Sequence, residues 1–121
     1  MKKLVLSFLV VCVLLALNCG GTKEFDITIQ LTNPQDKAVK FGGYYVLEET
    51  GDSVTLEGYT PEEYNFTMEE GDKIHGLVYK DTVDVTDTLN FRLLADDVEK
   101  LNQNVIIPYP LAAIQFELTV E

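Results

Sequence analysis

The sequence predicts an all-β fold, a small antiparallel sandwich of about seven or eight strands that follows an apolar N-terminal leader. Apolar and polar residues alternate at both ends of the stretch after the leader. Between those ends, short segments rich in β-branched and aromatic residues recur at intervals of about ten residues. Turn-forming sequences separate these segments, which is typical of a sandwich or barrel.

The first and last predicted strands have the clearest pattern. Every second residue is apolar, a period of two that places one face on a core and the other in water. In the first strand these residues are Phe25, Ile27, Ile29 and Leu31. In the last strand they are Ile114, Phe116, Leu118 and Val120.

Six further strands are predicted between these two, in the segments 39–47, 53–57, 64–68, 74–80, 88–95 and 104–107. Segments rich in Pro, Gly, Asn and Asp separate them, at 33–36, 49–52, 60–63, 69–72 and 95–97. The stretch 97–102 is the one place that could hold a helical turn.

Two pairs of residues in the second predicted strand indicate its local structure. Gly42 and Gly43 predict a β-bulge or a close approach of another backbone. Tyr44 and Tyr45 follow each other in a strand, so they face opposite sides of the sheet. One of them is expected in the core and the other on the surface.

The first eighteen residues have the three-part build of a secretory signal peptide. Lys2 and Lys3 give a cationic start, and residues 4–17 are almost entirely apolar. This run is shorter than the roughly 20 apolar residues that cross a bilayer, and it ends in a polar sequence. We therefore expect a signal peptide over residues 1–18 rather than a transmembrane helix.

The end of the leader, LALNCG (15–20), resembles the lipobox of bacterial lipoproteins. The usual box has Leu three residues before the cysteine and a small residue immediately before it, where this chain has Ala16 and Asn18. The resemblance implies cleavage before Cys19 and attachment there of diacylglycerol and an amide-linked chain such as palmitate. The alternative is an ordinary signal cut near Ala16, with Cys19 as a free or dimer-forming thiol.

The domain organisation that follows is a signal peptide over 1–18, a lipidated Cys19 with a short tether over 19–24, and a sandwich over 25–121. More than one acyl chain gives stable membrane attachment. In the sorting rule of enteric bacteria, Asp after the cysteine retains a lipoprotein at the inner membrane. Gly20 therefore favours the outer membrane, with the domain in the periplasm or at the cell surface.

The charge of the mature chain excludes some classes of partner. Of the 9 basic residues, two lie in the leader, which leaves 7 against 20 acidic residues and a formal charge of −13. Binding to nucleic acid or to anionic lipid needs a basic face, so this charge argues against both as partners.

Because Cys12 leaves with the signal and Cys19 carries lipid, no disulfide is available and stability must come from apolar burial.

Four short sequences in the sandwich are similar, in order, to the exported immunoglobulin-like domain of the MmpS family of mycobacterial membrane proteins. They are KFGGY (40–44), EGDKI (70–74), LNFRLLAD (89–96) and PYPLAAI (108–114). The resemblance implies a divergent immunoglobulin-like sandwich without the sheet-bridging cysteines or core tryptophan of antibody domains. Members of that family assist lipid or siderophore export pumps. Their transmembrane helix is replaced in this chain by the sequence that resembles a lipobox.

The sequence contains few candidate catalytic residues. Ser53 and His75 are the only serine and histidine after the leader. Ser53 follows a Gly-Asp pair and is interpreted as a turn residue, and His75 is expected at the surface of a strand rather than as a general base. One histidine cannot build a zinc site. We therefore predict no catalytic residues, no resident metal and no cofactor.

One group of acidic residues is a candidate calcium site. Asp81, Asp84 and Asp87 lie on a polar connection, where hard oxygen ligands suit calcium. Their spacing does not fit an EF-hand loop, and a charged hairpin is the alternative.

The functional expectation is a lipid-anchored, non-catalytic binding or structural protein of the cell envelope. Its alternative is an accessory subunit of an envelope export system.

Overall fold

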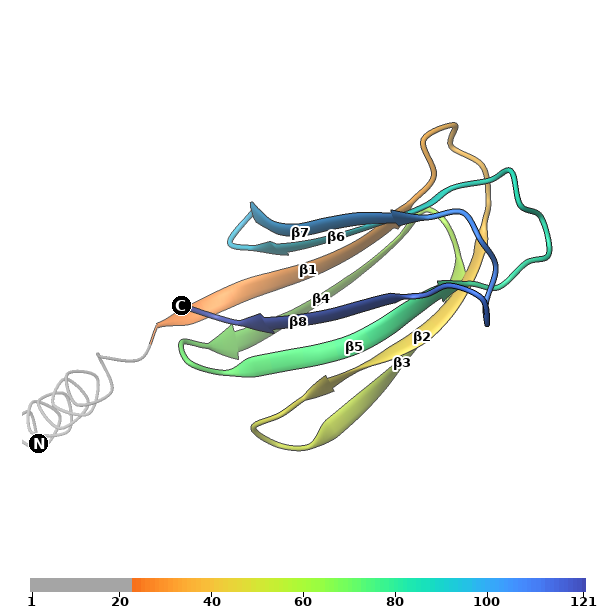
Figure 1. Cartoon of the computed structure of the whole chain (residues 1–121). Coiled ribbons are helices and arrows are strands. Elements are labelled where there is room, and N and C mark those ends of the chain that lie inside the picture. Colours follow the sequence, from red (N-terminus) through yellow and green to blue (C-terminus); the bar gives the residue numbers. More distant parts are fainter. Residues whose placement is uncertain (1–22) are drawn as a thin grey trace, which may run out of the picture.

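Eight antiparallel strands in two sheets form the domain in a computed structural model that describes residues 23–121 (Figure 1). The predicted signal peptide and Cys19 lie outside the described residues. The strands are β1 (Glu24–Thr32), β2 (Lys40–Leu47), β3 (Asp52–Tyr59), β4 (Glu62–Glu69), β5 (Lys73–Lys80), β6 (Leu89–Ala95), β7 (Val98–Val105) and β8 (Ile114–Thr119).

Each sheet has four strands, and the two sheets pack face to face. Sheet A has the order β4-β1-β6-β7, and sheet B has the order β3-β2-β5-β8. Every strand pair is antiparallel. The all-β antiparallel sandwich predicted from the sequence is confirmed. Among the described residues, no helix is long and apolar enough to cross a membrane.

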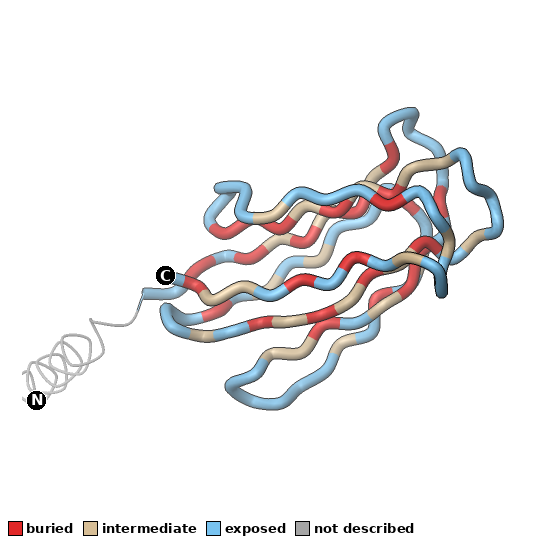
Figure 2. Tube along the Cα trace, viewed as in Figure 1, coloured by how far each residue is buried: buried red, intermediate tan, exposed pale blue. Residues whose placement is uncertain are grey.

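The core lies between the sheets and consists of the inward-facing residues of both (Figure 2). Two aromatic pairs join the sheets across it. Phe91 on β6 lies against Phe116 on β8, and Tyr45 on β2 stacks on Phe66 on β4, each with ring centroids 4.7 Å apart. Such pairs stabilise a core beyond the area that they bury.

The outer face of sheet A is covered by hydrogen bonds between polar side chains. Arg92 on β6 is central: its Nη1 donates to Gln30 on β1 at 3.0 Å, and its Nε donates to Glu99 on β7 at 2.8 Å. Gln30 in turn donates to Glu63 on β4 at 3.2 Å. One continuous network therefore crosses all four strands.

The two glycines of β2 allow residues of the neighbouring strand β5 to come close to its backbone. The register of β2 with β3 and β5 continues through Gly42 and Gly43 without a shift, so there is no bulge at this point. A Cβ on Gly42 would meet the ring of Tyr79, and a Cβ on Gly43 would collide with the carbonyl oxygen of Leu77. The register shift in sheet A lies instead between Leu93 and Leu94.

The adjacent tyrosines face opposite sides, as the sequence predicts. Tyr45 is 5% exposed and Tyr44 is 42% exposed. Desolvation raises the pKa of the Tyr45 hydroxyl, and the nearby Tyr64 adds to the effect.

Strand β7 corrects one prediction. The sequence allows a helical turn within 97–102 and predicts a strand over 104–107, whereas one strand covers Val98–Val105. No helical turn forms, because pairing with β6 supplies the backbone hydrogen bonds along this segment. Leu101 packs against the core, while Asn102 and Asn104 receive hydrogen bonds from Asn90 on the outer face.

The domain has two distinct ends (Figure 1). Residues 48–51, 70–72 and 96–97 form the hairpin turns at one end, together with Lys23 and Glu121; we call this the turn end. Backbone bonds join Glu70 to Lys23 and Gly71 to Val120 there. The other end, called the loop end, consists of residues 33–39, 60–61, 81–88 and 106–113.

Candidate binding surface

Exposed apolar side chains gather at the loop end. Seven of the nine large hydrophobic side chains that are exposed among residues 23–121 lie there or at the adjoining end of β3, and the most exposed are Val83 at 92% and Leu111 at 84%. The seven are Tyr59, Val83, Val85, Ile106, Ile107, Tyr109 and Leu111. An apolar surface rimmed by polar groups marks an interaction site.

Buried polar side chains hold the loops together from below. The Asn33 side chain donates to the carbonyl of Thr88 at 2.8 Å and accepts from the backbone N–H groups of Gln35 and Lys37. Thr60 donates its hydroxyl to the carbonyl of Lys37 at 2.6 Å and accepts from the N–H of Val39 at 2.9 Å. The apolar side chains therefore project from a fixed base.

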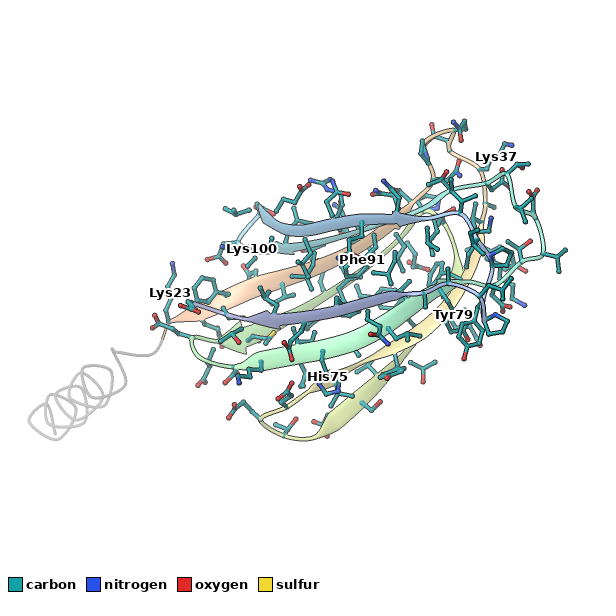
Figure 3. The ribbon with its side chains drawn as sticks, in the orientation of Figure 1. Lys23, Lys37, His75, Tyr79, Phe91 and Lys100 are labelled. Atoms are coloured by element: carbon teal, nitrogen blue, oxygen red, sulfur yellow. The ribbon has the colours of Figure 1, made fainter. Side chains whose placement is uncertain are left out.

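Strand β5 supplies two further supports at this end. The Lys80 side chain is fully buried, and its ammonium donates to the carbonyl of Asp87 at 2.6 Å. The Tyr79 ring lies 4.3 Å from the Tyr109 ring, and the N–H of Tyr109 donates to the carbonyl of Lys80. Figure 3 shows Tyr79 and Lys37 at this end, opposite Lys23. These contacts bring the 81–88 and 106–113 loops together.

The three aspartates considered for calcium have separate partners. The Asp81 carboxylate lies 3.6 Å from the Lys40 ammonium, and the Asp87 carboxylate lies 3.1 Å from the Lys37 ammonium. Within residues 23–121, no three His, Cys, Asp or Glu side chains are grouped as a metal site. The arrangement is a charged loop in which two of the three carboxylates pair with lysines.

Asp84 differs from the other two because no ion pair holds it among residues 23–121. One of its oxygens accepts hydrogen bonds from both the hydroxyl and the N–H of Thr86, at 2.6 Å each. These bonds lower the pKa of the Asp84 carboxyl, with the hydroxyl bond as the largest cause. Asp84 therefore carries a negative charge between the exposed Val83 and Val85.

Ser53 and His75 are not brought together. Both flank Val46, one on each neighbouring strand, so they are two strand spacings apart, about 9–10 Å. The His75 ring instead donates to Glu48 at 2.9 Å on the outer face of sheet B. Ser53 lies in β3 and is exposed rather than in the turn before it. This geometry contains no paired nucleophile and base.

Two shallow hollows lie on the sheet B side. One, of about 430 Å³, lies over β5 and β8 and includes Tyr44, His75 and Leu77. The other, of about 250 Å³, adjoins the loop end and includes Tyr59, Lys40 and Asp84. The second hollow has a largely polar lining and adjoins the apolar side chains of the loop end.

Acidic residues concentrate at the opposite end of the domain. The turn end is acidic on all three of its hairpins, and the acidic residues there are Glu48, Glu49, Glu70, Asp72, Asp96, Asp97 and Glu121. At the loop end, Lys37 and Lys40 offset Asp87 and Asp81. The formal charge of the domain is therefore strongest where the chain enters the sandwich.

The loop end was not predicted from the sequence. The available signal is the presence of large apolar residues inside polar or Pro-rich connections, as in DTVDVTD (81–87) and IIPYPLA (106–112). No known protein family, curated protein or solved structure matches this chain.

Proposed function

We propose that this chain is a bacterial lipoprotein that is anchored through Cys19 in the cell envelope and binds a protein partner through its loop end, without catalysis. The observation that carries the proposal is the gathering of exposed apolar side chains at the end opposite Lys23. A lipid on Cys19, only a few residues before Lys23, would hold the turn end toward the membrane and leave the loop end outward.

The tether, rather than charge, sets this orientation. The turn end is acidic, and the surfaces of membranes that contain anionic lipids are negative, so repulsion holds the domain away from its own membrane. The outward loops carry apolar area without a comparable excess of charge. Gly20 favours anchorage in the outer rather than the inner membrane.

The anchor is tested by mass spectrometry of the membrane-extracted protein. We expect an N-terminal peptide that begins at lipid-bearing Cys19, recovered from the outer-membrane fraction. The matched control is Cys19→Ser, which should remove the lipid while circular dichroism retains its β signal. An unmodified thiol at Cys19 in the wild-type protein would refute the anchor.

Binding through the loop end is tested by photocrosslinking in the native host. A crosslinking amino acid at Val83 or Leu111 should give a discrete adduct with one envelope protein. The control position is Thr67, which is exposed on the outer face of sheet A. Equal adducts from Thr67 and Val83 would contradict binding at the loop end.

The second candidate, an accessory subunit of an envelope export system, has the same requirement for a protein partner. It is supported by the resemblance of the sandwich to the MmpS family and by the outward loop end. Identification of the crosslinked protein separates the candidates: a transport component favours the accessory subunit, and a protein of another kind counts against it.

A further inference from the structure

The most exposed part of the loop end is the finger 82–86, in which two valines flank one aspartate. Val83 is 92% and Val85 is 61% exposed. The finger has its own internal support, since the N–H of Asp84 donates to the Thr82 hydroxyl and Thr86 donates twice to the Asp84 carboxylate. The charge of Asp84 is thus held between two apolar side chains.

The lysines near the finger have other partners. Lys37 and Lys40 pair with Asp87 and Asp81. The Lys80 ammonium is buried and donates to the carbonyl of Asp87, and its charge also acts on Asp84 from below. A group that approaches the finger therefore meets apolar area around the exposed Asp84 carboxylate, which no ion pair holds among residues 23–121. A complementary surface presents apolar side chains around a basic one.

A second copy of the chain fits this requirement poorly. The mature chain has 7 basic residues against 20 acidic ones, and the two lysines at the loop end are engaged in ion pairs. Two loop ends in contact would bring the Asp84 carboxylates together. Like charges in such a contact oppose association.

A lipid bilayer also fits poorly. Insertion of Val83 and Val85 would carry Asp84 into the hydrocarbon region, and an aspartate there costs about 3 kcal/mol on insertion scales. The hydrogen bonds from Thr86 favour the ionised form of Asp84 and make neutralisation harder. A protein surface can supply a basic partner, whereas hydrocarbon cannot.

We propose that the finger 82–86 is a recognition element for a protein surface with an apolar patch around a lysine or arginine, in which Val83 and Val85 contact the patch and Asp84 pairs with the basic group. This inference rests on the proposed function, because it names the chemistry of the partner that the loop end binds.

The test uses the full lipidated chain in dodecyl maltoside and three labelled peptides of equal length. One alternates lysine with leucine, one alternates lysine with serine, and one alternates glutamate with leucine. We expect the lysine–leucine peptide to bind about tenfold more tightly than the other two, measured by fluorescence anisotropy against empty micelles. Equal binding of the lysine–serine peptide would overturn the inference, since charge alone would then suffice.

Variants at the two ends of the domain separate the finger from the general acidity of the chain. Asp84→Asn, and Val83→Ser combined with Val85→Ser, should each weaken binding of the lysine–leucine peptide about tenfold. The matched controls are Asp97→Asn and Val98→Ser, which change an exposed aspartate and an exposed valine near the turn end. They should change affinity less than about twofold. Equal losses at both ends would overturn the inference.

Bilayer docking is checked with proteoliposomes that carry the full chain. If they bridge to a second population of phosphatidylethanolamine–phosphatidylglycerol vesicles, and Val83→Ser abolishes the bridging, the finger binds lipid and the inference is wrong. Absence of bridging, together with the peptide preference, supports a protein partner. The anchor is read separately from the mass of the Cys19 peptide, and the peptide-binding comparison does not need the lipid, so failure of the anchor and failure of the finger remain distinguishable.

Discussion

Gly43 in β2 shows how one residue sets the spacing of two strands. Its φ of +143° lies in a region that L side chains rarely adopt, and a Cβ there would collide with the Leu77 carbonyl. We expect Gly43→Ala to lower the free energy of unfolding by about 3 kcal/mol, measured by urea denaturation. Gly51→Ala is the control, since its φ is +78° but its added Cβ meets nothing within 4 Å.

The control should lose only about 1 kcal/mol, the cost of the backbone conformation alone. If both variants lose the same free energy of unfolding, the close approach of β2 and β5 is not the reason that position 43 needs glycine.

Asp84 gives a prediction about protonation. The Thr86 hydroxyl is the largest cause of its lowered pKa, so Thr86→Val should raise the pKa toward the ordinary value of 3.8. A ¹³C NMR titration of the Asp84 carboxyl carbon measures the midpoint directly. Thr82→Val is the control, because Thr82 accepts from the Asp84 N–H and leaves the carboxylate bonds intact.

The sign of the linked stability follows from the direction of this shift. A carboxyl whose pKa is lower in the folded protein stabilises the fold above its unfolded pKa, and that contribution is lost as the pH falls through the folded value. Thr86→Val should therefore make the domain less sensitive to acid at this site. An unchanged Asp84 midpoint in Thr86→Val would contradict the assigned cause.

At the scale of elements, the corner between β3 and β4 depends on the hydroxyl of Thr60. Thr60 is buried and bonds to both Lys37 and Val39, which ties the corner to the connection between β1 and β2. Thr60→Val keeps the shape but leaves two backbone groups without this partner. We expect a loss of about 2 kcal/mol in the free energy of unfolding by urea denaturation.

Thr60→Ser is the matched variant, because it retains the hydroxyl and loses one methyl group. It should lose about 1 kcal/mol. A larger loss in the serine variant than in the valine variant would show that packing, and not hydrogen bonding, holds this corner.

The strands differ in how well the sequence predicts them, for a physical reason. β1 and β8 have one face on the core, so their side chains alternate and their positions follow from periodicity. β7 is an edge strand in which only Val105 is buried and Leu101 is half-buried, and its register with β6 shifts near Leu101. Apolar and polar residues therefore do not alternate along β7, so the sequence does not mark this segment as a strand.

The loop end is harder to predict than any strand. Four connections from distant parts of the chain meet there, and their meeting depends on the strand order of both sheets. Periodicity identifies Val83 and Leu111 only as apolar residues within loops. Their common placement follows from long-range contacts such as the one between Tyr79 and Tyr109.

At the scale of the whole molecule, the uneven charge should make stability depend on salt. Acidic turns at one end repel one another, and ions screen that repulsion over about 10 Å at 0.1 M. We expect the melting temperature to rise by about 5 °C as sodium chloride increases from about 10 to about 300 mM. Differential scanning calorimetry provides the measurement.

A variant with Glu49→Lys and Glu70→Lys tests the origin of this effect, because both residues lie in exposed hairpin turns at the turn end. Its melting temperature should be higher at low salt and should change less with added salt. An equal salt response in the variant and the wild type would show that the turn end is not the source.

The closeness of Lys23 and Glu121 determines where the molecule can be extended. Backbone bonds from Glu70 to Lys23 and from Gly71 to Val120 hold both termini of the sandwich beside the same hairpin. A fluorescent reporter or purification handle joined after Glu121 would therefore start next to the point where the chain enters the domain. The opposite pole, with its valines and tyrosines, stays unobstructed in such a fusion.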